Sequence, residues 1–468
     1  MFRPVHILLF ILTAVLVTSA EVREFRIDQD RLWLCADSEP LPRLLEFFAA
    51  AGVQVQIDPS VQKTVSGEWS RADVEDVLDQ IISPYDYRFD WCRETGPLGE
   101  RTSLTGIRVF RKGFADEARP LHAVRRVMTT VDGRARYLAR EILIGFPPGA
   151  SMDDLNAFLA RTGGTVITAN TELGIYRILL PEGVNIPDLA AQLANDDSIA
   201  LAEPNYVYDL PDLLPGDGSD SGVPKEWTPP SADSGTLAVS VLDSGLLSDE
   251  SLGRAVLSAF DATNPDSPLT ADAVGHGTLM AKLAAGLVDP YNTAVGEGVP
   301  VVAIKAFADD GSADSYTLMS AMTYAVEESF GPVSLSWGSE TPSQFIQIAV
   351  DYAINNGSPV FAAVGNEKNG TPMYPAAIPE VLGVAAGTED GQYTAYSNEG
   401  SFVDIIAPGS AGGSQGTSVA TAYVAHIAAK YMRHHPEASA AETGAALINA
   451  AGPDRYLSAE DVRQLLAR

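Results

Sequence analysis

Short, nearly continuous apolar runs mark the second half of the chain. The runs LAVSVLDSG, VPVVAIKAF, PVSLSWG, SPVFAAVGN and VLGVAAG end in small or polar residues, and helical stretches such as TLMAKLAAGL lie between them. Strands that are buried on both faces of a parallel sheet have this pattern. We therefore predict an α/β domain over residues 236–468, with its chemistry at the carboxyl ends of the strands.

Two smaller α+β regions precede this domain. Residues 138–210 alternate as EILIGF, SMDDLNAFLART, GTVITAN, LGIYRILL, NIPDLAAQLAND and SIALAEPNYVYD, which predicts the order βαββαβ. Ser151 with Asp154 forms a helix-start pattern, and Asn185 with Pro187 forms another. This order occurs in proteins of many functions, so by itself it identifies none.

The region 21–115 has two helical patterns, LPRLLEFFAAAG and RADVEDVLDQII, among the strand patterns FRID, VQVQID, YDYRFDW and GIRVFRK. In this order, and above all over GVQVQIDPSVQKTVSGEWSRADVEDVLDQII, it resembles the short N-terminal domain of secretins and TonB-dependent receptors. The resemblance implies a Gram-negative envelope setting and an envelope protein partner that docks on this domain.

The chain begins with a secretory signal pattern and contains one polar linker. Residues 1–20 combine Arg3, an apolar run from Ile7 to Val17 and small residues before Glu21, which predicts export. An uncleaved membrane anchor is the alternative, but the run is shorter than the roughly 18 residues that a span needs. Residues 211–235 are rich in Pro, Gly, Ser and Asp, which predicts a flexible linker open to cleavage.

Composition narrows the classes of partner. The formal net charge of −30 repels phosphate backbones and anionic lipid headgroups, so we expect neither nucleic acid nor a membrane surface as partner. The two cysteines, Cys35 and Cys92, lie in the same N-terminal region. Export would expose them to an oxidising compartment, so we expect a disulfide, with two buried free thiols as the alternative.

Four residues at predicted strand ends or helix starts could carry chemistry. Asp243 ends LAVSVLD, His276 stands in GHGT directly before a helix, Ser418 follows Gly416 in GTSVATAYVA, and Asn366 ends AAVGN. Taken singly, each has a structural explanation, such as a turn-forming carboxylate or a loop histidine. Together they supply an acid, a base, a nucleophile at a helix amino end and an amide donor for an oxyanion.

The order Asp, His, Ser, with the blocks VLDSG, GHGTLMAKLAAG, VSLSWGS, AAVGNEKNG, YPAAIPEVLGVAAG, DIIAPG and GTSVATAYVA, resembles the catalytic domain of the subtilisin-like serine peptidases. The resemblance implies that Ser418 is the nucleophile, that His276 transfers its proton and that Asp243 orients the imidazole, while the Asn366 amide and the Ser418 N–H bind the oxyanion. It also implies two walls for an extended peptide substrate, namely Ser336, Trp337 and Gly338 on one side and Ala362, Ala363 and Gly365 on the other.

A second serine, Ser414, stands in the G-x-S-x-G pattern of α/β-hydrolases. That fold needs an acid and then a histidine downstream, and the later histidines, His426, His434 and His435, lie in or at the end of the helix that Ser418 begins. We therefore interpret Ser414 as a loop residue beside the cleft. Met373, before YPAAIP, is expected near the floor of the specificity pocket, where it would favour small or medium apolar residues.

The resemblance extends to the βαββαβ region, which is similar to the propeptides of this family. It implies a zymogen that cleaves itself between Asp209 and Gly235. Leu279 and Ala422 replace a histidine and a proline that are common in the family, without affecting the chemistry. No cofactor is expected and no metal is required; Asp289 and Asn292 are candidates for a structural calcium site, and surface polarity is the alternative reading. A catalytically silent or only self-cleaving scaffold that docks an envelope partner is the alternative function.

Overall fold

The structure, a computed structural model, describes residues 21–121, 125–216, 227–230, 237–247, 249–265, 272–291 and 296–467. It divides into two compact units. Unit 1 comprises Met1–Arg125, Ser151–Thr168 and Leu179–Gly183, and unit 2 comprises Arg126–Ala150, Ala169–Ile178 and Val184–Arg468. The predicted signal peptide and most of the predicted linker lie outside the described residues.

Unit 1 contains two sheets and two helices from the N-terminal region. One sheet has the order β1-β2-β4 and the other the order β5-β6-β3-β7. Its elements are β1 (Glu21–Asp28), β2 (Arg31–Pro40), α1 (Leu41–Ala50), β3 (Gln54–Ile57), β4 (Thr64–Asp73), α2 (Val74–Ile82), β5 (Asp86–Gly96), β6 (Gly99–Phe110), a 3-10 turn at Ala115–Glu117 and β7 (Arg119–Leu121). Leu44, Phe48 and Leu78 are fully buried in its core, as the helical spacing of apolar residues predicts.

Strand β4 has no counterpart in the predicted elements, and it displaces the start of the second helix. Arg71 and Ala72, which were predicted to be helical, belong to β4, and the helix begins at Val74. The Asp73 carboxylate caps it by accepting a hydrogen bond from the Glu75 N–H at 3.0 Å. Here the local capping signal locates the helix start better than the apolar period does.

The predicted disulfide is wrong in this structure, because Cys35 and Cys92 are both free. Cys35 lies on β2, opposite Glu68 of β4, whereas Cys92 lies on β5, opposite Ser103 of β6. The two cysteines therefore belong to different sheets. Two cysteines can lie in the same region of the sequence and still be too far apart in space for a disulfide, which needs a short Cα separation.

The predicted βαββαβ order is confirmed along the chain. Its elements are β9 (Arg136–Gly145), α3 (Met152–Thr162), β10 (Thr165–Asn170), β11 (Ile175–Leu179), α4 (Ile186–Leu193) and β12 (Leu201–Asp209). Ser151 and Asp154 form the expected capping box at α3, and Asn185 caps α4. The sheet has the order β10-β11-β9-β12-β19, so a short strand from the C-terminal region, β19 (Ser312–Asp314), pairs with its edge strand β12.

The C-terminal region of unit 2 is built on a seven-stranded sheet in the order β16-β18-β15-β20-β21-β22-β23, with every pair parallel. The strands are β15 (Val239–Asp243), β16 (Val256–Asp261), β18 (Val301–Lys305), β20 (Val333–Leu335), β21 (Val360–Ala363), β22 (Leu382–Gly387) and β23 (Ile405–Pro408). Every residue of β15, β18, β20, β21, β22 and β23 is buried, which confirms the prediction from their continuous apolar runs.

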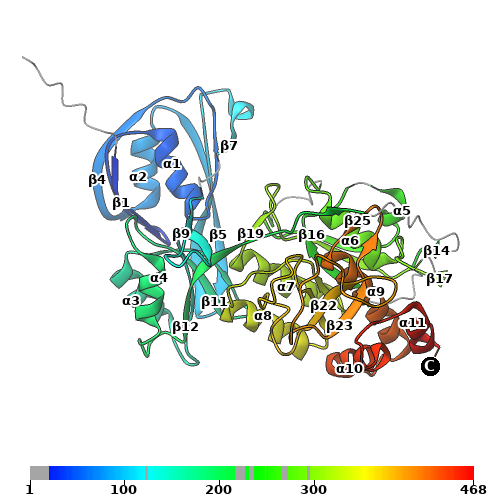
Figure 1. The fold of residues 1–468 in the computed structure, drawn as a ribbon. Helices are drawn as coiled ribbons and strands as arrows, with labels where there is room; N and C mark the ends of the chain where they lie inside the picture. The colour runs from blue at the N-terminus through cyan, green and yellow to red at the C-terminus, as the bar shows by residue number, and fades with distance from the viewer. Residues whose placement is uncertain are drawn as a thin grey trace, which may run out of the picture. The chain divides into compact units, whose positions relative to one another are not determined.

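Helices cover this sheet in two separate hydrophobic cores (Figure 1). The first core contains residues of α7 (Ser315–Glu328) and α8 (Gln344–Asn355), and the second contains residues of α6 (His276–Ala285) and α9 (Thr417–His434). The second core also contains residues of α10 (Ala440–Ala451) and α11 (Ala459–Leu466). The first thirteen residues of helix α9 are all buried, so its amino-terminal part is enclosed by the rest of the domain.

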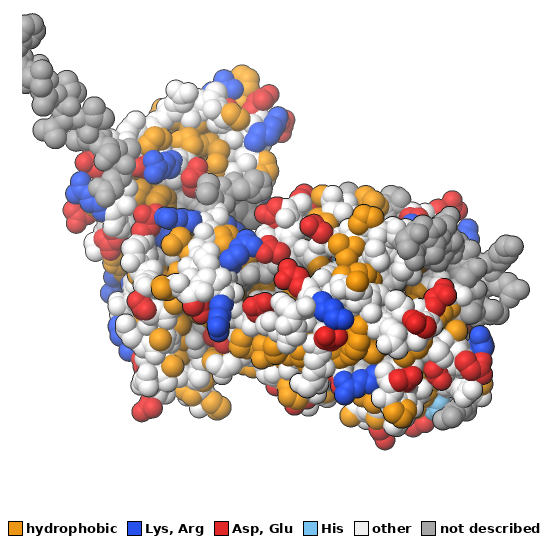
Figure 2. Space-filling view, in the orientation of Figure 1, with side chains coloured by type: hydrophobic (Ala, Val, Ile, Leu, Met, Phe, Trp, Pro, Cys, Tyr) orange, Lys and Arg blue, Asp and Glu red, His pale blue; other side chains and the backbone are white. Residues whose placement is uncertain are grey.

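Short elements complete the described chain: β8 (Val127–Thr129), β13 (Leu214–Pro215), β14 (Trp227–Thr228), α5 (Glu250–Gly253), β17 (Gly296–Glu297), β24 (Ser410–Ala411) and β25 (Ser414–Gln415). Among the described residues, no helix has the length and apolarity to cross a bilayer. On the face that Figure 2 shows, Asp and Glu side chains lie at many separate points, with Lys and Arg between them. The negative net charge is thus spread over this face instead of forming one acidic patch.

Candidate active site

The four predicted catalytic residues lie at neighbouring strand ends and helix starts. Asp243 is the last residue of β15, His276 the first of α6 and Ser418 the second of α9, and Asn366 follows β21. Because β15, β20 and β21 are adjacent in the parallel sheet, their carboxyl ends meet at one edge. Asp243, His276 and Ser418 are each 1% exposed.

Asp243 and His276 form a close pair. The Nδ1 atom of His276 lies 2.8 Å from Oδ1 and 2.9 Å from Oδ2 of Asp243. Burial lowers the pKa of His276, but the charge of Asp243 and its hydrogen bond raise it more, so the pKa lies above its usual value of 6.5. The next residue, Gly277, allows this approach, since a Cβ there would lie 2.6 Å from the Gly245 carbonyl oxygen.

The Ser418 hydroxyl donates to the carbonyl of Ser336, the residue after β20, at 3.3 Å. The Nε2 atom of His276 is buried and has no hydrogen-bond partner in the described chain. Buried nitrogens without a partner are rare and call for an explanation. This nitrogen is therefore available to accept a proton from a neighbouring hydroxyl.

Asn366 is held by the residue that precedes the serine. Its Oδ1 accepts from the Thr417 N–H at 2.9 Å and from the Thr417 hydroxyl at 3.0 Å. Because Thr417 offers two donors, the amide oxygen must face it, which leaves Nδ2 as a donor for another group. The amide is thereby oriented before any substrate is present.

Sequence analysis missed Asp272, whose carboxylate supports the start of α6. It accepts from the N–H groups of Gly275 at 2.7 Å and Thr278 at 2.9 Å, and from the hydroxyl of Ser244 at 2.8 Å. Burial raises the pKa of Asp272, but these hydrogen bonds outweigh it and the pKa is lowered. Its position a few residues before the helix in DAVGHGT, where capping residues occur, is the sequence signal that could have identified it.

Comparison with known proteins agrees with this geometry. The sequence model of the Subtilase family matches residues 234–464, and that of the Fervidolysin N-terminal prodomain matches residues 125–205. Thermitase from Thermoactinomyces vulgaris is 31% identical over 204 residues, which cover 41% of this chain and 72% of thermitase. The chain belongs to the subtilase family.

Two further relatives extend the match over the prodomain region. A thermophilic serine proteinase from Bacillus sp. (strain AK1) is 27% identical over 318 residues, 63% of this chain and 78% of that protein. The crystal structure of fervidolysin from Fervidobacterium pennivorans, described as a keratinolytic enzyme related to subtilisin, superposes with a TM-score of 0.58 at 18% identity. That match covers 73% of this chain and 63% of fervidolysin, and at this identity it shows a shared fold. The protein is thus a subtilisin-like serine endopeptidase with a prodomain.

The first predicted substrate wall of the subtilase domain follows β20. In the second wall, Ala362 and Ala363 end the neighbouring parallel strand β21 and Gly365 follows it. Met373 lies between the two walls, since a Cβ added at Gly365 would lie 3.2 Å from its Cγ and one at Gly338 would lie 3.5 Å from its Cε. The backbone of the next residue, Tyr374, exchanges two hydrogen bonds with Ser339, which fixes the segment there. Met373 therefore lies beside a glycine of each predicted wall, and its role as a pocket floor stays a prediction.

The last strand of the prodomain lies along the subtilase domain. Its residues Val207–Asp209 pair antiparallel with β19, and the Leu210 N–H donates to the Gly311 carbonyl at 2.9 Å. The Tyr208 ring packs edge-on against Trp337, with ring centres 5.5 Å apart. Trp337 belongs to a predicted substrate wall, so this strand contacts the surface that was assigned to an extended peptide.

The chain beyond this strand contacts the hairpin that precedes Ser418. Leu214 and Pro215 form β13, which pairs with Ser414 and Gln415 of β25, and the Gln415 side chain donates to the Pro215 carbonyl at 2.6 Å. Ser414, the serine of the G-x-S-x-G pattern, thus lies in a short hairpin strand that contacts the linker.

A buried polar cluster joins the prodomain to α7. Arg177 donates to Glu141 at 2.7 Å and lies 3.5 Å from Asp314, the residue that caps α7. The Asn205 side chain donates to both carboxylates and accepts from the Tyr316 N–H at 3.1 Å. Burial lowers the pKa of Arg177, but Asp314 and Glu141 together raise it, so the guanidinium stays charged.

A second polar contact caps α8. The Glu203 carboxylate accepts from the Ser343 hydroxyl at 2.7 Å and from the Gln344 N–H at 2.9 Å. A carboxylate at this position also interacts favourably with the helix dipole. The prodomain thus completes the amino ends of two helices that flank β20, which explains why its last strand is held in register.

Proposed function

We propose that this protein is an exported serine endopeptidase, made as a zymogen, that uses Asp243, His276 and Ser418 as its catalytic triad. The observation that carries the proposal is the buried Asp243 and His276 pair with an unpartnered Nε2, at the sheet edge where α9 begins. A protein that used the fold only as a scaffold would have no need for this arrangement.

In the proposed mechanism, Nε2 of His276 accepts the proton of the Ser418 hydroxyl while Oγ forms a bond to the scissile carbonyl carbon. The C–N bond then breaks, and the imidazolium gives its proton to the leaving amine. Water hydrolyses the acyl-enzyme by the same steps, which regenerates the serine. Asp243 holds Nδ1 and stabilises the imidazolium, in accord with the raised pKa of His276.

The tetrahedral oxyanion would accept hydrogen bonds from Nδ2 of Asn366 and from the Ser418 N–H. The two hydrogen bonds that Thr417 makes to Oδ1 support this role, because they orient the amide in advance. A preorganised donor of this kind is worth about 10²- to 10³-fold in rate.

We propose that self-processing cuts the chain between Leu210 and Leu214. The Leu210 N–H donates to the Gly311 carbonyl, and further along the chain Leu214 pairs with Gln415. Gln415 lies three residues before Ser418. The intervening residues must cross from one contact to the other. This segment is a small part of the region between Asp209 and Gly235 that the sequence indicated.

The test is the intact mass over time of the full chain and of Ser418→Ala, each incubated with casein. We expect the wild type to lose its N-terminal part at a bond within this segment and to degrade casein, and Ser418→Ala to do neither. Ser414→Ala is the matched control and should process normally. If the wild type stays folded, intact and inactive, the scaffold alternative replaces the proposal.

We propose further that Met373 restricts the residue before the cleaved bond to small or medium apolar side chains. Its contacts with Gly338 and Gly365 support a position between the two walls. Met373→Ala should increase kcat/KM for substrates with a large aromatic residue there by about tenfold, an estimate from the size of the apolar side chain removed. Efficient cleavage after large aromatics by the wild type would contradict this assignment.

The predicted signal peptide supports export to the periplasm or the medium of a Gram-negative bacterium. The likeness of residues 21–115 to the secretin and TonB-receptor short domain remains a prediction, and so does an envelope protein partner. Cell fractionation, with N-terminal sequencing of the exported protein, tests the first point. A chain retained with residues 1–20 in the cytoplasm would contradict it.

A further inference from the structure

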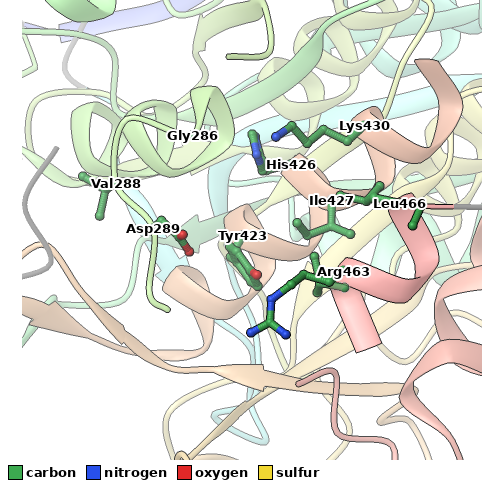
Figure 3. A pocket seen from close by; sticks show the side chains of 11 residues that line it. Gly286, Val288, Asp289, Tyr423, His426, Ile427, Lys430, Arg463 and Leu466 are labelled. Atoms are coloured by element: carbon green, nitrogen blue, oxygen red, sulfur yellow. The ribbon is translucent and has the colours of Figure 1, made fainter. Parts of the chain in front are cut away.

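A cavity of about 490 Å³ lies in the subtilase domain between the chain that follows α6, the middle turns of α9 and helix α11 (Figure 3). It lies beyond the carboxyl end of α6, whereas His276 begins that helix. Cavities of this size hold small organic ligands. Its lining residues are Gly286, Val288, Asp289, Tyr423, His426, Ile427, Lys430, Val462, Arg463, Leu466 and Ala467.

His426 offers a hydrogen-bond acceptor to this cavity. Its Nδ1 lies 2.9 Å from the Ala284 carbonyl, which can only accept, so Nδ1 carries the hydrogen and Nε2 has a lone pair. Burial lowers the pKa of His426 to about 3, so the ring stays neutral. A Cβ at Gly286 would lie 2.6 Å from Cε1 of His426 and 3.1 Å from Nε2, so the wall beside this nitrogen must be glycine.

Lys430 and Tyr423 offer hydrogen-bond donors from the same helix (Figure 3). In the described chain, the Lys430 ammonium has neither an ion pair nor a hydrogen bond, and the Tyr423 hydroxyl has no hydrogen-bond partner. Tyr423 is 3% exposed. Of the other two charged groups, Arg463 pairs with Glu460, and Asp289 accepts from the Tyr291 N–H. Burial lowers the pKa of Lys430, and the charges of Asp289 and Glu297 oppose this effect without forming an ion pair with Lys430 in the described chain.

The remaining wall is apolar and is made by Val288, Ile427, Val462 and Leu466. The cavity thus combines an acceptor, a phenolic donor, an unpaired cation and an apolar surface. A complementary ligand has an N–H group, a carboxylate and an apolar side chain. These three groups occur together in an N-acylated amino acid and in the C-terminal residue of a peptide.

We propose that this cavity binds the C-terminal residue of a peptide, or an N-acyl amino acid, whose side chain is apolar. The carboxylate contacts Lys430, whose ammonium lies beside the His426 ring (Figure 3). The amide N–H donates to Nε2 of His426, and the side chain packs against Ile427 and Leu466. The site is separate from the catalytic residues. Its occupancy does not require that Ser418 be the nucleophile.

The experiment is a ligand-observed NMR titration of the full-length Ser418→Ala chain, which keeps the protein intact whatever its activity. N-acetyl-L-leucine is the probe, with N-acetyl-L-leucinamide lacking the carboxylate and octanoate lacking the N–H. We expect the acid to bind at least tenfold more tightly than the amide and more tightly than octanoate. Equal binding of octanoate would make this a fatty-acid site and would overturn the peptide assignment.

Variants added to the Ser418→Ala chain locate the binding. Lys430→Met keeps the length of the side chain and should weaken N-acetyl-L-leucine about tenfold, while leaving the weak binding of the leucinamide unchanged. Lys282→Met is the matched control, because Lys282 on α6 pairs with Asp249 and does not line the cavity. Unchanged binding in Lys430→Met, or no binding of the acid to the parent chain, would refute the proposal.

Discussion

The two ends of α6 and α9 differ in how their polar side chains are paired. At the amino ends, Asp243, Thr417 and Ser336 supply partners from within the chain for His276, Asn366 and Ser418. At the far ends, His426 is bonded on one nitrogen only. The first arrangement is rigid before substrate arrives, which catalysis by preorganised dipoles requires. The arrangement at the far ends leaves polar atoms without hydrogen-bond partners, which a ligand could supply. At the amino ends, Nε2 of His276 is also without a hydrogen-bond partner in the described chain.

The largest expected effect at the catalytic end comes from Asp243→Asn. It removes the charge that holds Nδ1 of His276 and favours the wrong tautomer, so we expect kcat to fall by about 10⁴-fold. Kinetics with a peptide amide substrate measure this. Binding of N-acetyl-L-leucine at the far end should not change, and a parallel loss there would mean that the two ends are not independent.

Asn366→Ala should lower kcat by about 10²- to 10³-fold with little change in KM, because the amide is needed only when the oxyanion forms. Asn366→Asp is the matched variant, since it keeps the shape but replaces the N–H donor with a carboxylate. It should be at least as impaired. Near-normal kcat in both variants would remove Asn366 from the proposed site.

Each end also has a glycine without room for a side chain, and these two positions allow a direct comparison. A Cβ at Gly277 would lie 2.6 Å from a backbone oxygen, and a Cβ at Gly286 would lie 2.6 Å from the His426 ring. We expect Gly277→Ala and Gly286→Ala each to cost about 1–3 kcal/mol of unfolding free energy, as overpacking does. Thermal unfolding measures this in the Ser418→Ala chain.

The functional effects of these two glycine substitutions should differ. In an active chain, Gly277→Ala should also reduce kcat because it displaces His276. Gly286→Ala should instead weaken the binding of N-acetyl-L-leucine. The same loss of kcat in both variants would contradict a separation of the two ends.

The smallest expected effect is a shift of the acidic limb of the pH profile. His276 must be unprotonated to accept the serine proton, and its pKa is raised above 6.5 because Asp243 outweighs burial. Activity should therefore rise with pH, with a midpoint above 6.5. In Asp243→Asn, burial is opposed only by the smaller effect of the Asp272 charge, so the midpoint of the residual activity should move to lower pH. A midpoint that moves upward would contradict the assignment of Asp243.

Sequence reasoning succeeded where the signal is local. Continuous apolar runs predicted the buried parallel strands, and the residues at strand ends and helix starts singled out Asp243 and His276, which form a hydrogen-bonded pair. It failed where distant segments meet. The packing of Tyr208 on Trp337 joins residues far apart in the chain, and the contact of Asp272 with Ser244 joins residues 28 positions apart. The disulfide prediction failed because proximity in sequence was taken for proximity in space.

The pairing of β12 with β19 has a kinetic consequence. While the chain is continuous, the strand that contacts Trp337 is tethered to the subtilase domain at an effective concentration of the order of millimolar or more. A dilute substrate competes with it only if its affinity exceeds that of the strand by more than the ratio of the two concentrations. Cutting the chain after Leu210 converts this intramolecular contact into a bimolecular one. Activation should therefore be slow in concentrated solution and fast on dilution, so the enzyme is released as it diffuses away from the place where it was made.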